Sequence, residues 1–271
     1  MKSVWRLLVT PPARGAWNMA VDEALLEATG RGESLPTLRL YAWDPACLSL
    51  GYAQPFADVD IPRLRERGWD VVRRATGGRA ILHVDELTYS VTAPPDEPRV
   101  QGSVLESYQR LAQALMSALH ALGLPVLMEE HAPPAGVAKG PVCFEVPSAY
   151  EIVVGGKKLV GSAQARKRIG VLQHGTLPLH GDLTRITQTL IFPEESARLD
   201  AAQKLLARAT TVESATGQVI AWETAAQAFV GAFESQLGIR FERGELSGAE
   251  QAHAEELVQK KYANSSWTER V

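Results

Sequence analysis

The apolar positions in the first third of the chain follow two different periods. Between residues 20 and 28 they recur at the three- and four-residue spacing of a helix, which Gly30 ends. The short apolar segments before and after it, bounded by proline, glycine and aspartate, predict strands. The predicted strands are residues 5–10, 38–41, 47–50, 71–74 and 87–93.

The middle of the chain contains the most regular helical pattern. Ser103 and Glu106 have the spacing of a capping box, and leucines follow at helical intervals until Gly123. Residues 130–141 are rich in proline and glycine and have no period, so we expect a mobile loop that serves as a lid. Three apolar segments at 150–154, 158–165 and 171–179, separated by turn residues, predict an antiparallel meander.

The last third is mainly helical in pattern. Helices are predicted over 199–209 and 222–237, and a third begins at Ser247, where Glu250 completes a second capping box. Strands and helices are mixed without an internal repeat or a clear linker. We therefore predict one α+β domain with a mixed sheet flanked by helices. Residues 1–245 form its catalytic part, and residues 246–271 are a C-terminal helix and tail that fold back on it.

Composition narrows the class of protein. The 271 residues are 45% hydrophobic and 22% charged, with a net charge of −3. This charge gives no general attraction to nucleic acid. Two cysteines are too few for a disulfide framework, and no apolar segment reaches the length of a membrane helix. We expect a cytoplasmic monomer that binds neither nucleic acid nor membrane.

Candidate chemistry lies in two segments that combine glycine with basic residues, 73–80 and 156–163, with Cys143 between them. Glycine lets backbone N–H groups approach an anionic or carbonyl oxygen closely, and the cations add positive charge. Cys143 follows the proline-rich loop, where reactive groups are commonly displayed, and nearby lysines would favour its thiolate. The pattern favours acyl transfer. Cys47 lies in an apolar strand, so we assign it to the core.

Three motifs resemble those of a known superfamily. The first is Arg73-Arg74-x-Thr76-Gly77-Gly78-Arg79-Ala80-Ile81-Leu82-His83, and the second is Lys158-Leu159-Val160-Gly161-Ser162-Ala163-Gln164, followed by Gln173-His174-Gly175-Thr176-Leu177. Both resemble signatures of the biotin/lipoate protein ligase and lipoyl/octanoyl transferase superfamily. The third, Cys143-Phe144-Glu145-x-Pro147-Ser148-x-Tyr150-Glu151, resembles the cysteine loop of the LipM-type octanoyltransferases.

The resemblance implies the fold of that superfamily and a two-step acyl transfer. Cys143 would take octanoyl from acyl carrier protein as a thioester, and a lipoyl-domain lysine, such as that of glycine-cleavage H protein, would accept it. Lys158 would hold the acyl carbonyl and assist the thiolate. No cofactor is expected, because the incoming thioester is already activated. No metal is expected, because no pair of His or Cys residues has the spacing of metal ligands. The implied substrate-binding residues are Arg73, Arg74, Thr76, Gly77, Gly78, Arg79, His83, Gly161, Ser162, Ala163, His174 and Gly175.

Several alternatives stay open at this point. The same fold serves ATP-dependent lipoate–protein ligases, although a ligase does not need Cys143 and the chain leaves little room for an accessory domain. An amidotransferase that takes octanoyl from H protein would share the cysteine chemistry. A non-catalytic acyl-binding regulator would not need both Cys143 and Lys158. His83 is interpreted equally well as a catalytic base, an oxyanion donor or a structural residue.

Docking of an acidic carrier protein requires a local positive patch on this acidic chain. The densest basic cluster in the sequence is Lys157, Lys158, Arg166, Lys167 and Arg168. If the turns of the predicted meander lie together, these side chains project from one neighbourhood beside the site. The alternative is that Arg166, Lys167 and Arg168 are only a solvated hairpin tip.

Overall fold

The computed structural model of the chain describes residues 2–130 and 150–271. The predicted loop 130–141, apart from its first residue, and Cys143 lie outside this part of the chain. The strands are β1 (Ser3–Val9), β2 (Thr37–Tyr41), β3 (Cys47–Leu50), β4 (Asp70–Arg73), β5 (Ile81–His83), β6 (Glu86–Ala93), β7 (Leu127–Glu130), β8 (Tyr150–Val154), β9 (Lys157–Lys167), β10 (Gly170–Pro178) and β11 (Ile239–Arg243). The helices are α1 (Gly15–Gly30), α2 (Ile61–Glu66), α3 (Val104–Ala121), α4 (Glu195–Arg208), α5 (Val212–Thr216), α6 (Trp222–Leu237), α7 (Gly248–Leu257) and α8 (Ser265–Thr268), with short helical turns η1 (Phe56–Asp58), η3 (Leu183–Thr189) and η4 (Val258–Tyr262).

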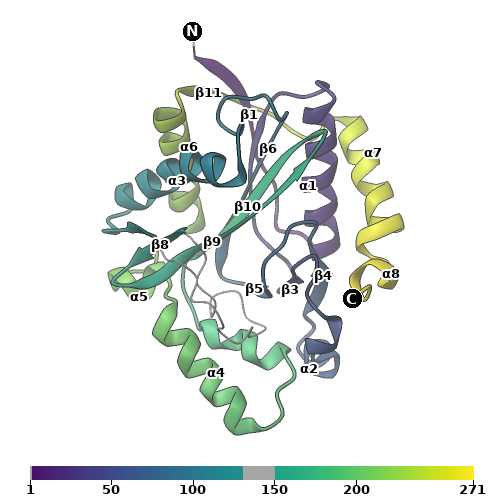
Figure 1. Cartoon of the computed structure of the whole chain (residues 1–271), viewed down its shortest axis with the longest axis vertical. Helices are drawn as coiled ribbons and strands as arrows, with labels where there is room; N and C mark the ends of the chain where they lie inside the picture. The colour runs from purple at the N-terminus through teal and green to yellow at the C-terminus, as the bar shows by residue number, and fades with distance from the viewer. Residues whose placement is uncertain (1, 131–149) are drawn as a thin grey trace.

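Eight strands form one mixed sheet in the order β11-β1-β2-β6-β10-β9-β8-β7. The first three strands are parallel, and the strands from β2 to β7 pair antiparallel. Figure 1 shows α3 and α6 on one face of this sheet and α1, covered in turn by α7, on the other. The predicted α+β fold with a mixed sheet flanked by helices is confirmed.

The two faces of the sheet are buried by alternating side chains of the same strands. Leu7, Leu40 and Tyr89 pack with Phe229 and Phe233 of α6, whereas Leu8 and Tyr41 pack against α1. Burying one leucine or phenylalanine side chain completely stabilises the folded state by about 1.5–3 kcal/mol relative to leaving it exposed. Because successive side chains of a strand point to opposite faces, one strand contributes to the core on both sides of the sheet.

The local signals for helices and turns are also confirmed. Ser103 accepts from the Glu106 N–H while the Glu106 carboxylate accepts from the Ser103 N–H, and Ser247 and Glu250 do the same at α7. β8, β9 and β10 form the predicted antiparallel meander. By contrast, the sequence did not predict β5, β7 or β11. The last of these becomes a strand by pairing in parallel with β1, a contact about 235 residues away in sequence.

The two predicted strands around the turn at Asp44-Pro45 belong to different sheets. β2 lies in the large sheet, whereas β3 is the central strand of a small sheet with the order β4-β3-β5. This small sheet has its own core, which includes Leu48, Leu50 and Ile186. It delivers the segment after β4, residues 74–80, toward β10 and β9.

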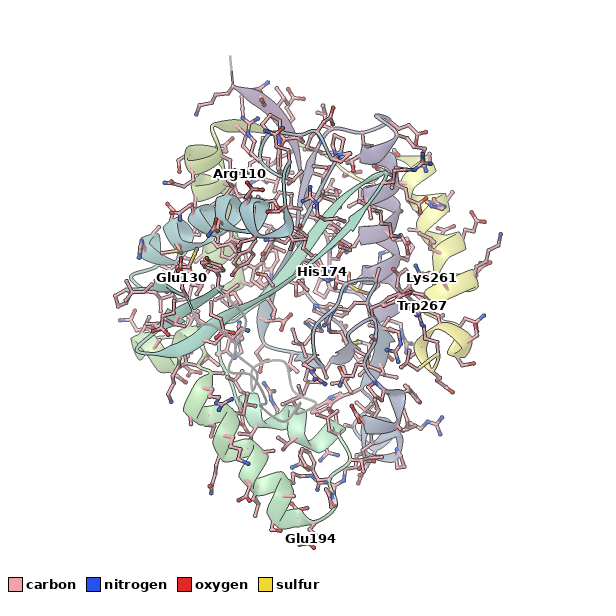
Figure 2. All side chains as sticks on the ribbon, in the orientation of Figure 1. Arg110, Glu130, His174, Glu194, Lys261 and Trp267 are labelled. Carbon is pink, nitrogen blue, oxygen red and sulfur yellow. The ribbon has the colours of Figure 1, made fainter. Side chains whose placement is uncertain are left out.

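The C-terminal helices are held to the body by ion pairs and aromatic contacts. Glu23 of α1 is buried and accepts from Lys167, Lys261 and the Tyr262 hydroxyl at 2.6–2.7 Å. Lys261 also lies 4.2 Å from the centre of the Trp267 ring, and Figure 2 labels both residues on this side of the molecule. Burial disfavours the charged form of Glu23, but the two lysines and Tyr262 outweigh it and lower its pKa to about 2. In the described ranges, no helix is both long and apolar enough to cross a membrane.

Candidate active site

A cavity of about 40 Å³ lies against the α1 face of the large sheet. Gly161 and Ala163 of β9 stand opposite Thr176 and His174 in the register of the sheet. Because these two residues have almost no side chain, they leave space above the strand that larger residues would fill. The walls are mainly apolar and aromatic. The lining residues are Met19, Tyr41, Trp43, Arg74, Gly78, Ile81, His83, Thr88, Gly161, Ser162, Ala163, His174, Gly175 and Thr176.

The glycine loop after β4 reaches the mouth of this cavity. Gly78 has a φ of +97°, a backbone conformation that favours glycine, and both Gly77 and Gly78 are exposed. Arg74 holds the loop from within, because its Nη2 donates to the carbonyls of Gly77 and Arg79 at 3.0 Å each. Arg74 thus lines the cavity and at the same time fixes the conformation of the loop.

Arg73 is not brought into the cavity. Its guanidinium is fully buried and donates to the carbonyls of Gly51, Gln54 and Thr268 at 2.6–2.9 Å. Adjacent residues of a strand point to opposite sides, so Arg73 and Arg74 cannot both face the cavity. Arg73 joins the small sheet to α8, whereas the sequence assigned it to substrate binding.

His83 connects the cavity wall to this loop through a chain of buried hydrogen bonds. Its Nδ1 lies 2.6 Å from Glu86 Oε1, and its Nε2 lies 2.7 Å from Ser49 Oγ. Ser49 Oγ in turn accepts from Arg74 Nη1 at 2.7 Å. The ring of His83 stacks on Trp43 at a centroid distance of 4.0 Å. This arrangement holds His83 in one orientation at the cavity wall.

His174 stands in a second buried chain on the other side of the loop. Its Nε2 lies 2.7 Å from Thr76 Oγ1, and its Nδ1 lies 3.1 Å from Asp22 Oδ2. Burial lowers the pKa of His174, although Asp22 opposes the shift. For Asp22, burial disfavours the charge, but His174 and the Arg39 guanidinium outweigh it, so its pKa lies below the ordinary value. Figure 2 shows His174 near the centre of the molecule.

Lys158 lies on the opposite face of β9 from Gly161 and Ala163. Its Nζ donates to Glu151 Oε1 at 2.7 Å, and both side chains are largely buried. Lys158 lines a second hollow against α3, together with Tyr108 and Val160, and this hollow meets the first cavity at Ser162 and Ala163. Lys157 points away and donates to the Leu206 carbonyl. The two lysines point to different sides, as the alternation predicted, and the role of Lys158 in the site stays a prediction.

Gly175 is required by close packing behind the cavity. A Cβ at this position would lie 2.7 Å from both Ser162 Oγ and the Tyr89 ring, and 2.5 Å from the Gly161 carbonyl. Ser162 Oγ forms a 2.8 Å hydrogen bond with the Tyr89 hydroxyl, which accepts from Gln173. Gly175 therefore allows β9 and β10 to pair where the two hollows meet.

The predicted basic docking patch is wrong. β9 runs for 11 residues from Lys157 to Lys167, so its ends are roughly 30 Å apart. Lys157 contacts α4, whereas Lys167 pairs with Glu23 of α1. The meander places the two turns at opposite ends of a long strand, and the basic residues do not form one surface.

Sequence analysis missed the buried partners of the predicted residues. Asp22, Ser49, Glu86 and Glu151 each hold a predicted side chain in place, yet none was assigned a role. Glu86 and Glu151 stand beside or within the recognised motifs, which was the available signal. Cys47 is fully buried, as predicted, and burial raises the pKa of its thiol well above the ordinary value. In the ranges 2–130 and 150–271, no group of three or more His, Cys, Asp or Glu residues could hold a metal ion.

Comparison with known proteins agrees with this geometry. Residues 14–234 match the model of the lipoyl protein ligase A/B catalytic domain. The chain belongs to this family. Within it, the chain is 42% identical to a protein of Kyrpidia tusciae named octanoyltransferase LipM, over 98% of both chains. It is 35% identical to the protein of the same name from Staphylococcus aureus, over 98% of this chain and 99% of the other.

Solved structures of lipoyl protein ligases share the fold. A bipartite lipoate protein ligase from Thermoplasma acidophilum, studied with its E2 lipoyl domain, superposes with a TM-score of 0.79 at 26% identity, covering 99% of this chain and 96% of the other. A lipoate-protein ligase A bound with ATP also gives 0.79, at 25% identity and 99% coverage of both chains. As a member of the family with these relatives, the chain is an acyltransferase enzyme.

Proposed function

We propose that the chain transfers octanoyl from acyl carrier protein to the lysine of a lipoyl domain, such as that of glycine-cleavage H protein, in the cytoplasm. The name octanoyltransferase LipM on full-length relatives at 35–42% identity supports this reaction. The observation that carries the proposal is the apolar cavity beside the glycine loop. An octanoyl chain is apolar, and the cavity offers it the surfaces of Met19, Tyr41 and Trp43.

The transfer proceeds in two steps. The Cys143 thiol gives up its proton, and the thiolate attacks the carbonyl carbon of the incoming thioester to form a new C–S bond. The C–S bond to the carrier breaks, and the carrier sulfur leaves as a thiol with the proton that Cys143 gave up. The acceptor amine then forms a C–N bond with the same carbon, the C–S bond to Cys143 breaks, and the proton lost by nitrogen returns to sulfur. Cys143 lies outside the described residues, so its role rests on its motif.

Lys158 supplies positive charge to this chemistry. Its ammonium is held by Glu151 in the hollow against α3, which meets the acyl cavity at Ser162 and Ala163. A fixed cation stabilises both a thiolate and the oxyanion of a tetrahedral intermediate. The exposed Gly77 and Gly78 and the partly exposed Arg79 offer N–H groups and charge at the mouth of the cavity, where a carrier would deliver its acyl group.

Intact-mass analysis tests the proposal. The purified chain is incubated with octanoyl-acyl carrier protein in the absence of ATP, and a mass gain of one octanoyl group is expected. The Cys143→Ala variant should show no gain, and addition of an apo-lipoyl domain should move the adduct to that domain. Modification of the domain only when free octanoate and ATP are present would instead identify a ligase. An adduct from octanoyl-H protein but not from acyl carrier protein would identify an amidotransferase.

A further inference from the structure

A third cavity, distinct from the hollow at Lys158, opens beside the acyl cavity, which is the cavity lined by Met19, Tyr41 and Trp43. It shares two wall residues with the acyl cavity, Ile81 and Thr176. Its volume is about 40 Å³. Apolar side chains such as Leu82, Leu183 and Ile186 form much of its wall. We call this cavity the amine slot.

Thr176 presents an unsatisfied hydroxyl at the junction of the two cavities. The residue is 1% exposed, and its Oγ1 has no hydrogen-bond partner within the described parts of the chain. Its neighbour in the register, Thr88, donates to Glu86 and accepts from Trp43 and so has both its bonds. A buried hydroxyl without a partner costs about 1–3 kcal/mol. Such a group is expected where a ligand completes the hydrogen bond.

The charge of the slot selects among ligands. Three carboxylates line it, those of Asp85, Glu86 and Asp182. The basic side chains are Arg185, which is already paired with Asp85, and His180, whose Nδ1 lies 4.0 Å from Asp85 Oδ2. Asp85 and Arg185 are partly exposed, with 27% and 33% of their side chains accessible, so the charge gathers toward the mouth. Excess negative charge above apolar walls fits a primary ammonium on an alkyl stem. The same charge repels the phosphate of a carrier arm.

We propose that the amine slot admits the acceptor lysine and that Thr176 Oγ1 hydrogen-bonds its amine. This inference rests on the proposed function. The lysine stem lies along the apolar wall, and the ammonium loses one proton to solvent at the acidic mouth. At the inner end, the neutral amine meets the acyl carbon, forms the C–N bond, and the thiol leaves with the second proton. Thr176 orients the nitrogen at the point where the slot joins the acyl cavity.

The test uses Thr176→Val, which keeps the shape and removes the hydroxyl. In a two-step exchange, kcat/KM for each substrate reports its own half-reaction. We expect kcat/KM for the apo-lipoyl domain to fall by about tenfold or more, the loss of one hydrogen bond, with kcat/KM for octanoyl-acyl carrier protein unchanged. Thr176→Ser should recover most of the acceptor rate. Thermal stability should not fall, because the hydroxyl has no partner to lose.

Thr92→Val provides a matched control. Thr92 is also 1% exposed, also has an Oγ1 without a partner in the described residues, and lines neither cavity. This variant should keep both kinetic constants. An unchanged acceptor constant in Thr176→Val, or a fall in the donor constant instead, would overturn the assignment of the slot. A wild-type chain that transfers no octanoyl at all would instead reject the proposed function.

Discussion

The imidazole of His83 is bound to the carboxylate of Glu86 at 2.6 Å, with both side chains buried at the wall of the acyl cavity. The carboxylate accepts from Nδ1, and Nε2 faces the Ser49 hydroxyl, which accepts from Arg74. The Arg74 guanidinium also donates hydrogen bonds to the backbone carbonyls of Gly77 and Arg79 in the glycine loop. The conformation of the glycine loop therefore depends on a carboxylate that the loop never touches.

Ser49→Ala breaks this chain at its middle. The Arg74 guanidinium and His83 Nε2 each lose a buried partner, so we expect the free energy of unfolding to fall by about 1–3 kcal/mol. We also expect kcat/KM to fall by about tenfold as the loop loosens. Urea unfolding and steady-state transfer assays measure both. Ser196→Ala, at an exposed serine, should change neither by a comparable amount. Full activity in Ser49→Ala would show that the glycine loop keeps its conformation without the hydrogen bonds through Ser49.

The two cysteines should respond oppositely to substitution. Cys143→Ala should abolish transfer with little change in stability. Cys47→Ala should keep its activity and lose roughly 1 kcal/mol of stability, because this fully buried side chain loses its packing contacts. Mass spectrometry of the acyl adduct and thermal unfolding separate the two effects. An octanoyl adduct on Cys143→Ala would exclude the thioester mechanism.

Lys158→Met tests the buried ion pair at β9. Removing the cation leaves the Glu151 carboxylate without the 2.7 Å contact, so we expect a loss of about 1–3 kcal/mol in stability and of at least about a hundredfold in kcat. The double variant Lys158→Met with Glu151→Gln should recover the stability but not the activity. Recovery of activity in the double variant would show that Lys158 is structural only.

Acid should weaken the contact between the C-terminal helices and α1. The pKa of Glu23 is about 2 in the folded chain, against an ordinary value of 4.5. A lowered folded pKa means that the stabilisation is complete above about pH 4.5 and is lost as the pH falls toward 2. Glu23→Gln should cost on the order of 1–3 kcal/mol at pH 7 and reduce the loss of stability between pH 5 and 3. Identical pH profiles for the variant and the wild type would contradict this linkage.

The sequence by itself determined the elements that depend on near neighbours. Capping boxes at Ser103 and Ser247 act over three residues, and the alternation along β8, β9 and β10 fixes which side chains share a face. The same alternation correctly separated Lys157 from Lys158. The motifs predicted the family and the glycine loop, because the residues that form them are contiguous.

Only the tertiary structure decided which residues face the cavity and what holds them there. Asp22 of α1 meets His174 across 152 positions, and Arg73 reaches Thr268 across 195, so no local pattern could indicate either contact. Strand length set the basic residues of β9 far apart, although they are close in sequence. Burial and cross-strand register are properties of the whole fold. Because of them, Arg73, which the sequence predicted to bind ligand, is a buried structural residue. They also place the Thr176 hydroxyl, which has no hydrogen-bond partner in the described residues, at the junction of two cavities.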